Sequence, residues 1–425
     1  MGWRKILFFI LLTGIAFQVS GQDSRLAISE QERQEQLKKV KPAKSSKIIK
    51  FLDTAENVGI DQYIQFNVQD FRLGFGQISP LSGITPAIRW EQPRIGSTDL
   101  TVWLSGAYSI HSHQAYEFQF GYFEKPAPRD YQGHSYPEFP FDVDYRSQDD
   151  MRPFLYADSM YRVFPKEEYF GLGGDSLKNN HSIYKMEEYT GGVIGGYQFT
   201  RSIVAKARLE FVQPTLHNSP YDNYDETSTV FNESTAPGLT SQPSFIRYGA
   251  SLVAAHYGDP FKPSGLISLD VARYKDREGG NFTFTRYQFD GRGYLTLGCR
   301  QRVIAARFFV SHDDPAENAI VPFYMMESIG GQDTLRGFHN FRFTDRNILY
   351  MSTEYRWEGN PAVELAVFYD TGKAFADPAD LNFQHLEHSY GFGIRFKNLR
   401  KTVIRFDIGW SKENTFLYVA PSVAF

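Results

Sequence analysis

Two short clusters in this chain carry residue types that do chemistry in other proteins. His111-Ser112-His113 has the donors of a metal pair or of a Ser/His site, and the glycine-rich Gly171–Ser176 could cradle a phosphate. No acidic orienting group lies near the histidines in the sequence, and no Lys-Ser/Thr pair follows the glycines, as a phosphate loop requires. We therefore interpret both clusters as polar turns, and we expect no catalytic residue, no metal site and no cofactor.

A different kind of chemistry, ion pairing, is open to Arg336, Glu354 and Asp370. A guanidinium presents a rigid fork of donors that suits carboxylates, and Gly337 beside it allows the backbone to approach a neighbouring wall closely. The residues alone leave two alternatives. Either Arg336 pairs with one or both acids, or it lies at the tip of an exposed turn while the acids line a wet pore.

The elements that must position these residues are strands, because apolar residues recur with a period of two through most of the chain. Residues 203–211 alternate in this way, with Lys, Arg and Glu on one face. In 348–357 the apolar face leaves Glu354 on the polar side, and in 363–370 it leaves Asp370 there. The two carboxylates are therefore predicted to point to the same polar side from neighbouring strands.

The composition excludes membrane helices but is compatible with a membrane protein of another kind. The chain has 425 residues, a net charge of −4, 16% aromatic residues and a mean hydropathy of −0.40. A charge so close to neutral offers no basis for binding nucleic acid. No apolar run of about 18 residues lies beyond the N-terminal stretch, which excludes an ordinary helical membrane protein. Strands that alternate lipid-facing and lumen-facing residues keep the average polar, as in a transmembrane β-barrel.

The predicted fold is all-β: a closed transmembrane antiparallel β-barrel over residues 81–425. At roughly 25 residues for a strand and its connection, it has about sixteen strands. Short turns near 358–361 and 398–401 alternate with long connections at 373–387 and 311–346. Short turns are periplasmic and long loops extracellular in such barrels. We therefore expect 311–346 to be a long extracellular loop and the C-terminus to be periplasmic.

The N-terminal residues predict export. Two basic residues precede the apolar stretch 6–19 and small residues follow it, so residues 1–21 are predicted to be a secretory signal peptide. Residues 22–80 are predicted to be a periplasmic N-terminal tail, in which Ser29 and Glu32 form the capping-box pattern of a short helix. A solvated tail is favoured over a helix that binds the membrane surface or a partner.

Four features resemble a known family. Leu335-Arg336-Gly337-Phe338 is similar to the Arg-Gly-Phe/Tyr signature of the bacterial surface antigen family, the BamA/TamA-type assembly barrels and two-partner secretion transporters. Phe368-Tyr369-Asp370-Thr371-Gly372 resembles the family's Phe-x-Asp-x-Gly strand motif, and Glu354 stands where the family has an acidic strand residue. Phe170–Ser176 resembles a recurrent segment of these barrels. The resemblance covers about residues 80–425.

The resemblance implies that the long extracellular loop folds into the barrel lumen and that Arg336 pins it there through Asp370, Glu354 or both. It implies a non-enzymatic protein in the outer membrane of a diderm bacterium, with both termini in the periplasm. Its function would be to assist the insertion or translocation of proteins, or of lipids. The implied partners are outer-membrane lipid, client outer-membrane proteins, and periplasmic or lipoprotein accessory subunits.

The chain departs from the family ahead of the barrel. Residues 22–80 are too few for a series of POTRA domains and lack their βααββ pattern. We therefore expect a barrel-only member, which puts in doubt the capture of periplasmic clients and would require separate partner subunits. Two other functions stay open: a transport channel gated by the Arg336 loop, and a scaffold subunit of a larger outer-membrane complex.

The end of the chain carries one more mark. Residues 415–425 alternate apolar positions and end in the aromatic Phe425. This resembles the terminal strand signal by which outer-membrane barrels are recognised for insertion. The alternative is an ordinary last strand that ends in phenylalanine.

Overall fold

The structure is a computed structural model. It describes residues 66–68, 71–76, 79, 81–83, 85–92, 95–122, 152–200, 202–221, 223–256, 264–298, 302–360, 362–397 and 402–420. The predicted signal peptide, most of the predicted tail and Phe425 lie outside these residues.

Seventeen strands form one sheet, and two more pair separately. The strands of the large sheet are β1 (Phe66–Val68), β2 (Phe71–Gly76), β3 (Thr85–Gln92), β4 (Leu100–Tyr108), β5 (Gln114–Tyr122), β6 (Arg152–Tyr169), β7 (Ser182–Thr200), β8 (Ile203–His217), β9 (Phe245–His256), β10 (Ser264–Asp276), β11 (Phe284–Thr296), β12 (Arg302–Pro315), β15 (Asn347–Asn360), β16 (Val363–Phe375), β17 (Glu387–Lys397), β18 (Thr402–Ser411) and β19 (Thr415–Ala420). The separate pair is β13 (Glu327–Ile329) and β14 (Phe343–Asp345).

Helical structure among the described residues is confined to short turns. The one α-helical turn is α4 (Thr227–Val230), and 3-10 turns lie at Lys178–Asn180, Phe323–Met325 and Pro378–Asp380. None of the described helices has the length and apolar character needed to cross a membrane.

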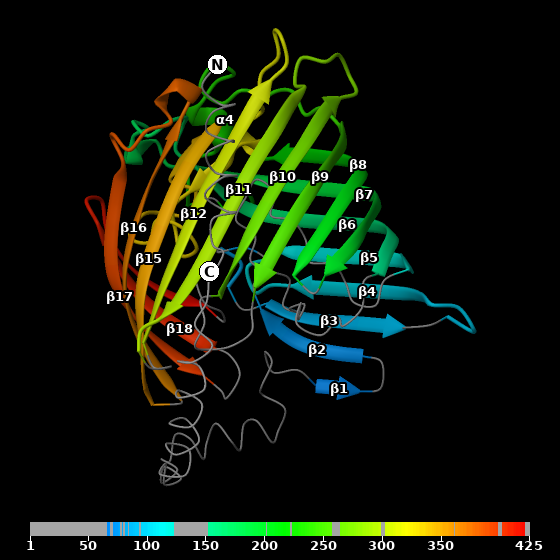
Figure 1. Cartoon of the computed structure of the whole chain (residues 1–425). Helices are drawn as coiled ribbons and strands as arrows, with labels where there is room; N and C mark the ends of the chain where they lie inside the picture. The colour runs from blue at the N-terminus through cyan, green and yellow to red at the C-terminus, as the bar shows by residue number, and fades with distance from the viewer. Residues whose placement is uncertain are drawn as a thin grey trace, which may run out of the picture. The chain divides into compact units, whose positions relative to one another are not determined.

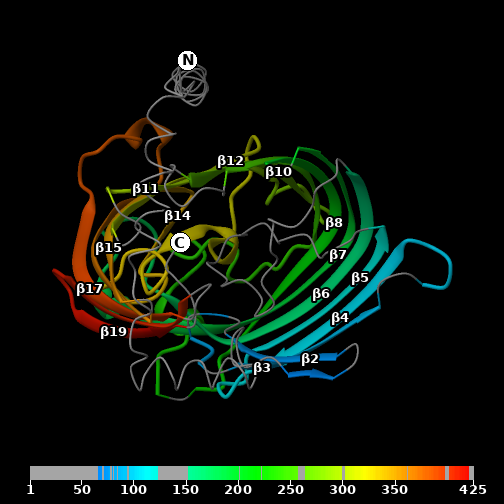
Figure 2. The same cartoon turned by 60° about the horizontal axis from the view of Figure 1, so that its bottom comes forward.

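Every strand of the large sheet pairs antiparallel with its neighbour along the chain (Figure 1). β12 pairs with β15 across the long connection 316–346, which we call the inner loop. Figure 2 shows the sheet curled around this loop, which is drawn in yellow. The predicted all-β antiparallel class is thus confirmed.

The strand count agrees with the expected number of about sixteen: sixteen strands have six or more residues, and the three-residue β1 adds a seventeenth. The predicted closure of the barrel needs correction. Among the described residues no register joins β19 to β1 or β2, so the sheet is not closed there. The strands that would meet at this closure, β1 and β19, are each followed directly by residues outside the described ranges.

The sheet also begins earlier than the predicted boundary at residue 81, because β1 and β2 lie within 66–76. Their apolar alternation at Phe71, Leu73 and Phe75 covers only six residues, too few to stand out as a strand in the sequence.

The two faces of the sheet differ in polarity, and the apolar face is the exposed one. On β5, Phe118 and Phe120 are exposed, while Glu117 and Gln119 between them are buried. We call the apolar face the outer face and the polar face, which turns toward the inner loop, the inner face. An apolar outer face is what contact with lipid requires.

Apolar packing on the inner face gathers beside the first part of the inner loop. Phe323 and Tyr324 of the loop belong to a cluster with Tyr169 of β6, Tyr184 of β7 and Phe245 of β9. The ring centroids of Tyr169 and Phe323 are 4.6 Å apart. This cluster anchors the start of the loop, so the segment that follows leaves from a fixed position.

Candidate functional site

The second half of the inner loop, residues 327–345, is a preorganised turn. The pairing of β13 with β14 ties its two ends together. Between them, the N–H of Gly330 donates to Oγ1 of Thr334 at 2.7 Å. Leu335 and Phe338 are fully buried in a cluster with apolar residues of β15 and β16. These contacts therefore fix the conformation of the tip, which carries the predicted motif, independently of the ion pairs that Arg336 makes.

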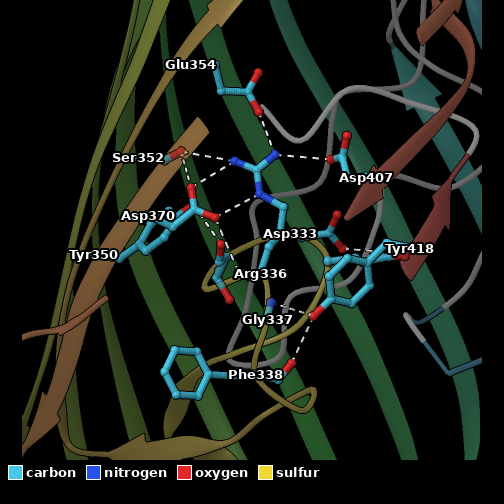
Figure 3. A network of polar contacts seen from close by, with 12 residues as sticks. Asp333, Arg336, Gly337, Phe338, Tyr350, Ser352, Glu354, Asp370, Asp407 and Tyr418 are labelled. Atoms are coloured by element: carbon cyan, nitrogen blue, oxygen red, sulfur yellow. Dashed lines mark hydrogen bonds and ion pairs between the residues drawn. The ribbon is translucent and has the colours of Figure 1, made fainter. Parts of the chain in front are cut away.

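Arg336, at this tip, joins three strands of the inner face (Figure 3). Its Nε and Nη2 donate to the two oxygens of Asp370 on β16, each at 2.8 Å. Its Nη1 donates to Glu354 on β15 at 2.6 Å and to Asp407 on β18 at 3.1 Å. All four side chains are 0% exposed. The structure thus brings Arg336 within ion-pair distance of both acids that the sequence singled out.

Phe368 and Gly372 of the predicted strand motif shape the space into which the Arg336 tip fits. The Arg336 guanidinium lies over the Phe368 ring, with Cζ 3.4 Å from the ring centroid. That ring fills the space over Gly391 of β17, where a Cβ would lie 2.1 Å from Phe368 Cζ. Gly372 makes room for the loop, because a Cβ there would lie 3.0 Å from Cδ1 of Ile329.

The backbone that follows Arg336 lies directly on the last two strands. Gly337 has a φ of +98°, and a Cβ on it would lie 2.8 Å from the carbonyl carbon of Trp410 in β18. Its N–H donates to the hydroxyl of Tyr418 in β19 at 2.9 Å, and that hydroxyl donates to the carbonyl of Phe338 at 3.0 Å. Glycine is therefore required at 337 for both its conformation and its contact.

Sequence reasoning missed the contribution of β18. Asp407 is the third acid on Arg336, and Arg405 donates from Nη2 to Oδ1 of Asp333 in the loop at 2.9 Å. The sequence did contain a signal for both residues, because 404–410 alternates apolar residues with Arg405, Asp407 and a glycine. Nothing in that alternation, however, tells which distant cation an inward acid meets.

The acids around Arg336 are shared with other cations. Burial would lower the pKa of the Arg336 guanidinium, but the carboxylates of Asp370, Glu354 and Asp407 outweigh burial and raise this pKa well above its ordinary value. Three more arginines contact the same acids: Arg356 and Arg395 contact Glu354 at 2.7 and 2.8 Å, and Arg405 contacts Asp407 at 3.0 Å. The site is therefore a buried network of fixed charges.

The segment Phe170–Ser176, which the sequence analysis also singled out, packs on the same loop. The N–H of Gly173 donates to the carbonyl of Thr344 at 2.9 Å. Oγ of Ser176 accepts from Nη1 of Arg342 at 2.7 Å. The structure brings together the loop residues and the strand residues of the predicted site. They are Leu335, Arg336, Gly337 and Phe338 in the inner loop, and Glu354, Phe368, Asp370 and Gly372 on the strands that it contacts.

This arrangement is suited to holding a loop in place. The described part of the chain holds no group of three or more His, Cys, Asp or Glu residues placed to bind a metal ion. The acids of the network are bound to arginines instead. What the site does chemically is to fix the inner loop against β15, β16 and β18 by buried, charge-assisted hydrogen bonds.

We expect Gly409→Ala to loosen the inner loop. A Cβ at Gly409 would lie 2.8 Å from the carbonyl carbon of Arg336 and from the nitrogen of Gly337, so the loop backbone would have to move off β18. Overpacking of this kind should lower the free energy of unfolding by about 1–3 kcal/mol and speed amide hydrogen exchange over residues 330–342. Gly293→Ala on β11 is the matched control, because a Cβ there meets no atom within 4 Å. Equal effects of the two substitutions would contradict the close contact.

Comparison with known proteins agrees with this fold. The model of the Omp85 superfamily domain matches residues 100–415. BamA from Haemophilus ducreyi, in a structure lacking POTRA domains 1-3, is similar with a TM-score of 0.55 and 14% identity, over 82% of this chain and 68% of that one. No curated protein sequence matches the chain.

Two CdiB structures are similar at lower TM-scores. CdiB from Acinetobacter baumannii has a TM-score of 0.46 and 10% identity, over 83% of this chain and 60% of that one. CdiB from Escherichia coli has a TM-score of 0.48 and 11% identity, over 84% of this chain and 61% of that one. The chain therefore spans less than two thirds of either CdiB.

Proposed function

Because the chain belongs to the Omp85 superfamily, we propose that this outer-membrane β-barrel protein assists the insertion or translocation of other proteins, or of lipids, at the outer membrane. Its fold is like that of BamA, and its exposed apolar face suits a lipid bilayer.

The observation that carries the proposal is the docked inner loop. One fully buried guanidinium ties the loop to β15, β16 and β18, and the hydroxyl of Tyr418 ties it to β19. A loop fixed to both the body of the sheet and its last strands is placed to control how that end of the sheet moves. An exposed turn, the alternative reading of Arg336, would have no such effect.

The proposed mechanism uses the ends of the sheet. Among the described residues no register joins β19 to β1 or β2, so we place a weak closure of the sheet between them. A strand edge exposed at such a closure presents unpaired N–H and C=O groups that can template a strand from another chain.

The two ends of the chain and its partners have proposed places in this function. Residues 1–21 would direct export, residues 22–80 would lie in the periplasm up to the start of the sheet, and both termini would be periplasmic. Phe425 would complete the terminal insertion signal. Client outer-membrane proteins and periplasmic or lipoprotein accessory subunits would be the partners.

Depletion of the protein in its host bacterium tests the function. We expect several unrelated outer-membrane barrels to fall together in abundance, measured by quantitative mass spectrometry of the outer membrane, and to recover when the wild-type chain is supplied. The Arg346→Ala chain should also restore them, because the substitution leaves the backbone N–H of Arg346 in place and removes a guanidinium that donates to an exposed carbonyl, that of Ala376. An outer-membrane proteome that does not respond to depletion would rule the function out.

A gated transport channel is the second candidate, favoured by the polar inner face of the strands. If the inner loop closes a channel, the purified protein in planar bilayers should conduct weakly, and Arg336→Ala should raise the conductance severalfold. Equal conductance of the two proteins would count against a channel gated by this loop.

A further inference from the structure

The turn between β18 and β19 is held from inside by a second arginine of the inner loop. Nε and Nη2 of Arg342 donate to the two carboxylate oxygens of Glu413 in that turn, each at 2.9 Å. The side chains are 3% and 12% exposed, respectively. The hydrogen bonds of a bidentate ion pair are roughly twice as strong as neutral ones, and a pair with so little exposure is screened by solvent less than one on the surface.

The same turn has a second attachment, to the connection between β6 and β7. Nζ of Lys178 donates to the carbonyl of Glu413 at 3.3 Å and to Oδ1 of Asn414 at 3.0 Å. Arg342 reaches this connection too, because Nη1 donates to Oγ of Ser176 at 2.7 Å. Arg342 therefore joins three segments that are far apart in the sequence.

The strand that follows this turn also contacts the loop along its inner face. The Tyr418 hydroxyl is both acceptor and donor to the loop backbone, at Gly337 and Phe338 (Figure 3). The ring of Phe416, one inward position earlier, meets the ring of His339 edge to face with centroids 5.0 Å apart. Both inward side chains of this stretch of β19 thus touch the loop.

Pairing within the sheet holds β19 less extensively. Its register with β18 covers six residue pairs, from Arg405↔Ala420 to Trp410↔Thr415. Over the part of the chain that the structure describes, no register joins β19 to a strand on its other edge. Contacts with the inner loop therefore add to the pairing with β18 in holding β19 in place.

From these contacts we propose that Arg342 and Tyr418 are positioning residues that latch the terminal hairpin, β18–β19, to the inner loop. When the loop undocks at Arg336, the latch opens and β19 is freed with it. The inference rests on the proposed function in one respect: a sheet end that templates another chain must be able to move, and the latch determines when it moves.

Hydrogen exchange on the purified full-length chain in lipid nanodiscs tests the latch. Arg342→Gln and Tyr418→Phe should each speed amide exchange over residues 412–420 by about tenfold to a hundredfold, the range for loss of a charge-assisted or buried hydrogen bond. Exchange in β10 to β12 should not change. Arg346→Gln is the matched arginine control, and Tyr390→Phe, on the outer face at 62% exposure, is the tyrosine control.

Two further variants separate a latch from general loosening. If Arg342 acts through Glu413, the double variant Arg342→Gln/Glu413→Gln should exchange no faster over 412–420 than the faster single variant. Arg336→Ala tests the coupling, because the Arg336 guanidinium donates to Asp370, Glu354 and Asp407 rather than to Glu413 or Tyr418, yet its loss should speed exchange over 412–420. Unchanged exchange there in Arg336→Ala and Tyr418→Phe would overturn the latch, as would an equal rise in every strand.

The outcome is independent of the test of function. If depletion leaves the outer-membrane proteome unchanged while exchange over 412–420 responds as expected, the latch stands and the proposed function fails. If depletion lowers the abundance of several barrels while amide exchange in β19 is unchanged in the loop variants, the function stands and the latch is overturned.

Discussion

Arg336→Ala should lower the free energy of unfolding by about 3–5 kcal/mol, the cost of removing one partner from a buried ion pair. The reason is the charge that remains. Glu354 keeps Arg356 and Arg395, and Asp407 keeps Arg405. Among the described residues, Arg336 is the only cation within ion-pair distance of Asp370, whose side chain is fully buried. Urea titration of the chain in lipid vesicles measures the loss.

A second substitution identifies the cause of this loss. Arg336→Ala/Asp370→Asn should recover part of the stability, because the amide leaves no uncompensated charge and can still accept from the Ser352 hydroxyl, now 2.6 Å from Asp370 Oδ1. Arg346→Ala, in the same loop, should change the free energy of unfolding by less than about 0.5 kcal/mol. A double variant no more stable than Arg336→Ala would show that the orphaned carboxylate is not the source of the cost.

Glu354→Gln should lower the free energy of unfolding by nearly as much, about 3–5 kcal/mol. The carboxylate of Glu354 accepts from Arg336 at 2.6 Å, from Arg356 at 2.7 Å and from Arg395 at 2.8 Å. An amide of the same shape removes the one charge that these three guanidinium groups share and brings an N–H₂ group toward donors. The same titration in vesicles measures the effect.

Glu358→Gln is the matched control for this prediction. Glu358 lies on the same strand and pairs with Lys397 at 2.6 Å, but its side chain is 30% exposed, so its loss should cost no more than about 1 kcal/mol. If the two glutamine variants were equally stable, burial of the Glu354 network would contribute nothing measurable.

The inner face was predictable from the sequence because side chains alternate along a strand. That period placed Glu354 and Asp370 inward, and both are fully buried on the inner face. The same period runs through 404–410 and would have placed Arg405 and Asp407 inward as well. The prediction that Arg336 reaches the acids, in contrast, depended on family resemblance. No pattern in the sequence around Arg336 indicates which face of the sheet a long loop contacts.

The contacts of the terminal hairpin were beyond such reasoning. Arg342 and Glu413 are 71 residues apart, and Tyr418 is 81 residues from Gly337. Neither pair lies within one strand, so the strand period does not relate its two members. Arg342 lies in a connection, where no alternation of apolar and polar residues indicates which way a side chain points. The limits of the sheet were missed for a different reason, since β1 and β2 are too short to show a pattern.

The positions of the three acids on Arg336 have a consequence for how the chain folds. Glu354, Asp370 and Asp407 follow Arg336 by 18, 34 and 71 residues, so every one of them is synthesised and delivered after the arginine. Loop closure over such separations comes late, because its entropic cost precedes the contacts that offset it. Docking of Arg336 on all three acids therefore requires β15, β16 and β18 to be in place, so we expect it to be complete only after β18 has joined the sheet. A fully docked arginine would thus report that β18 has been added.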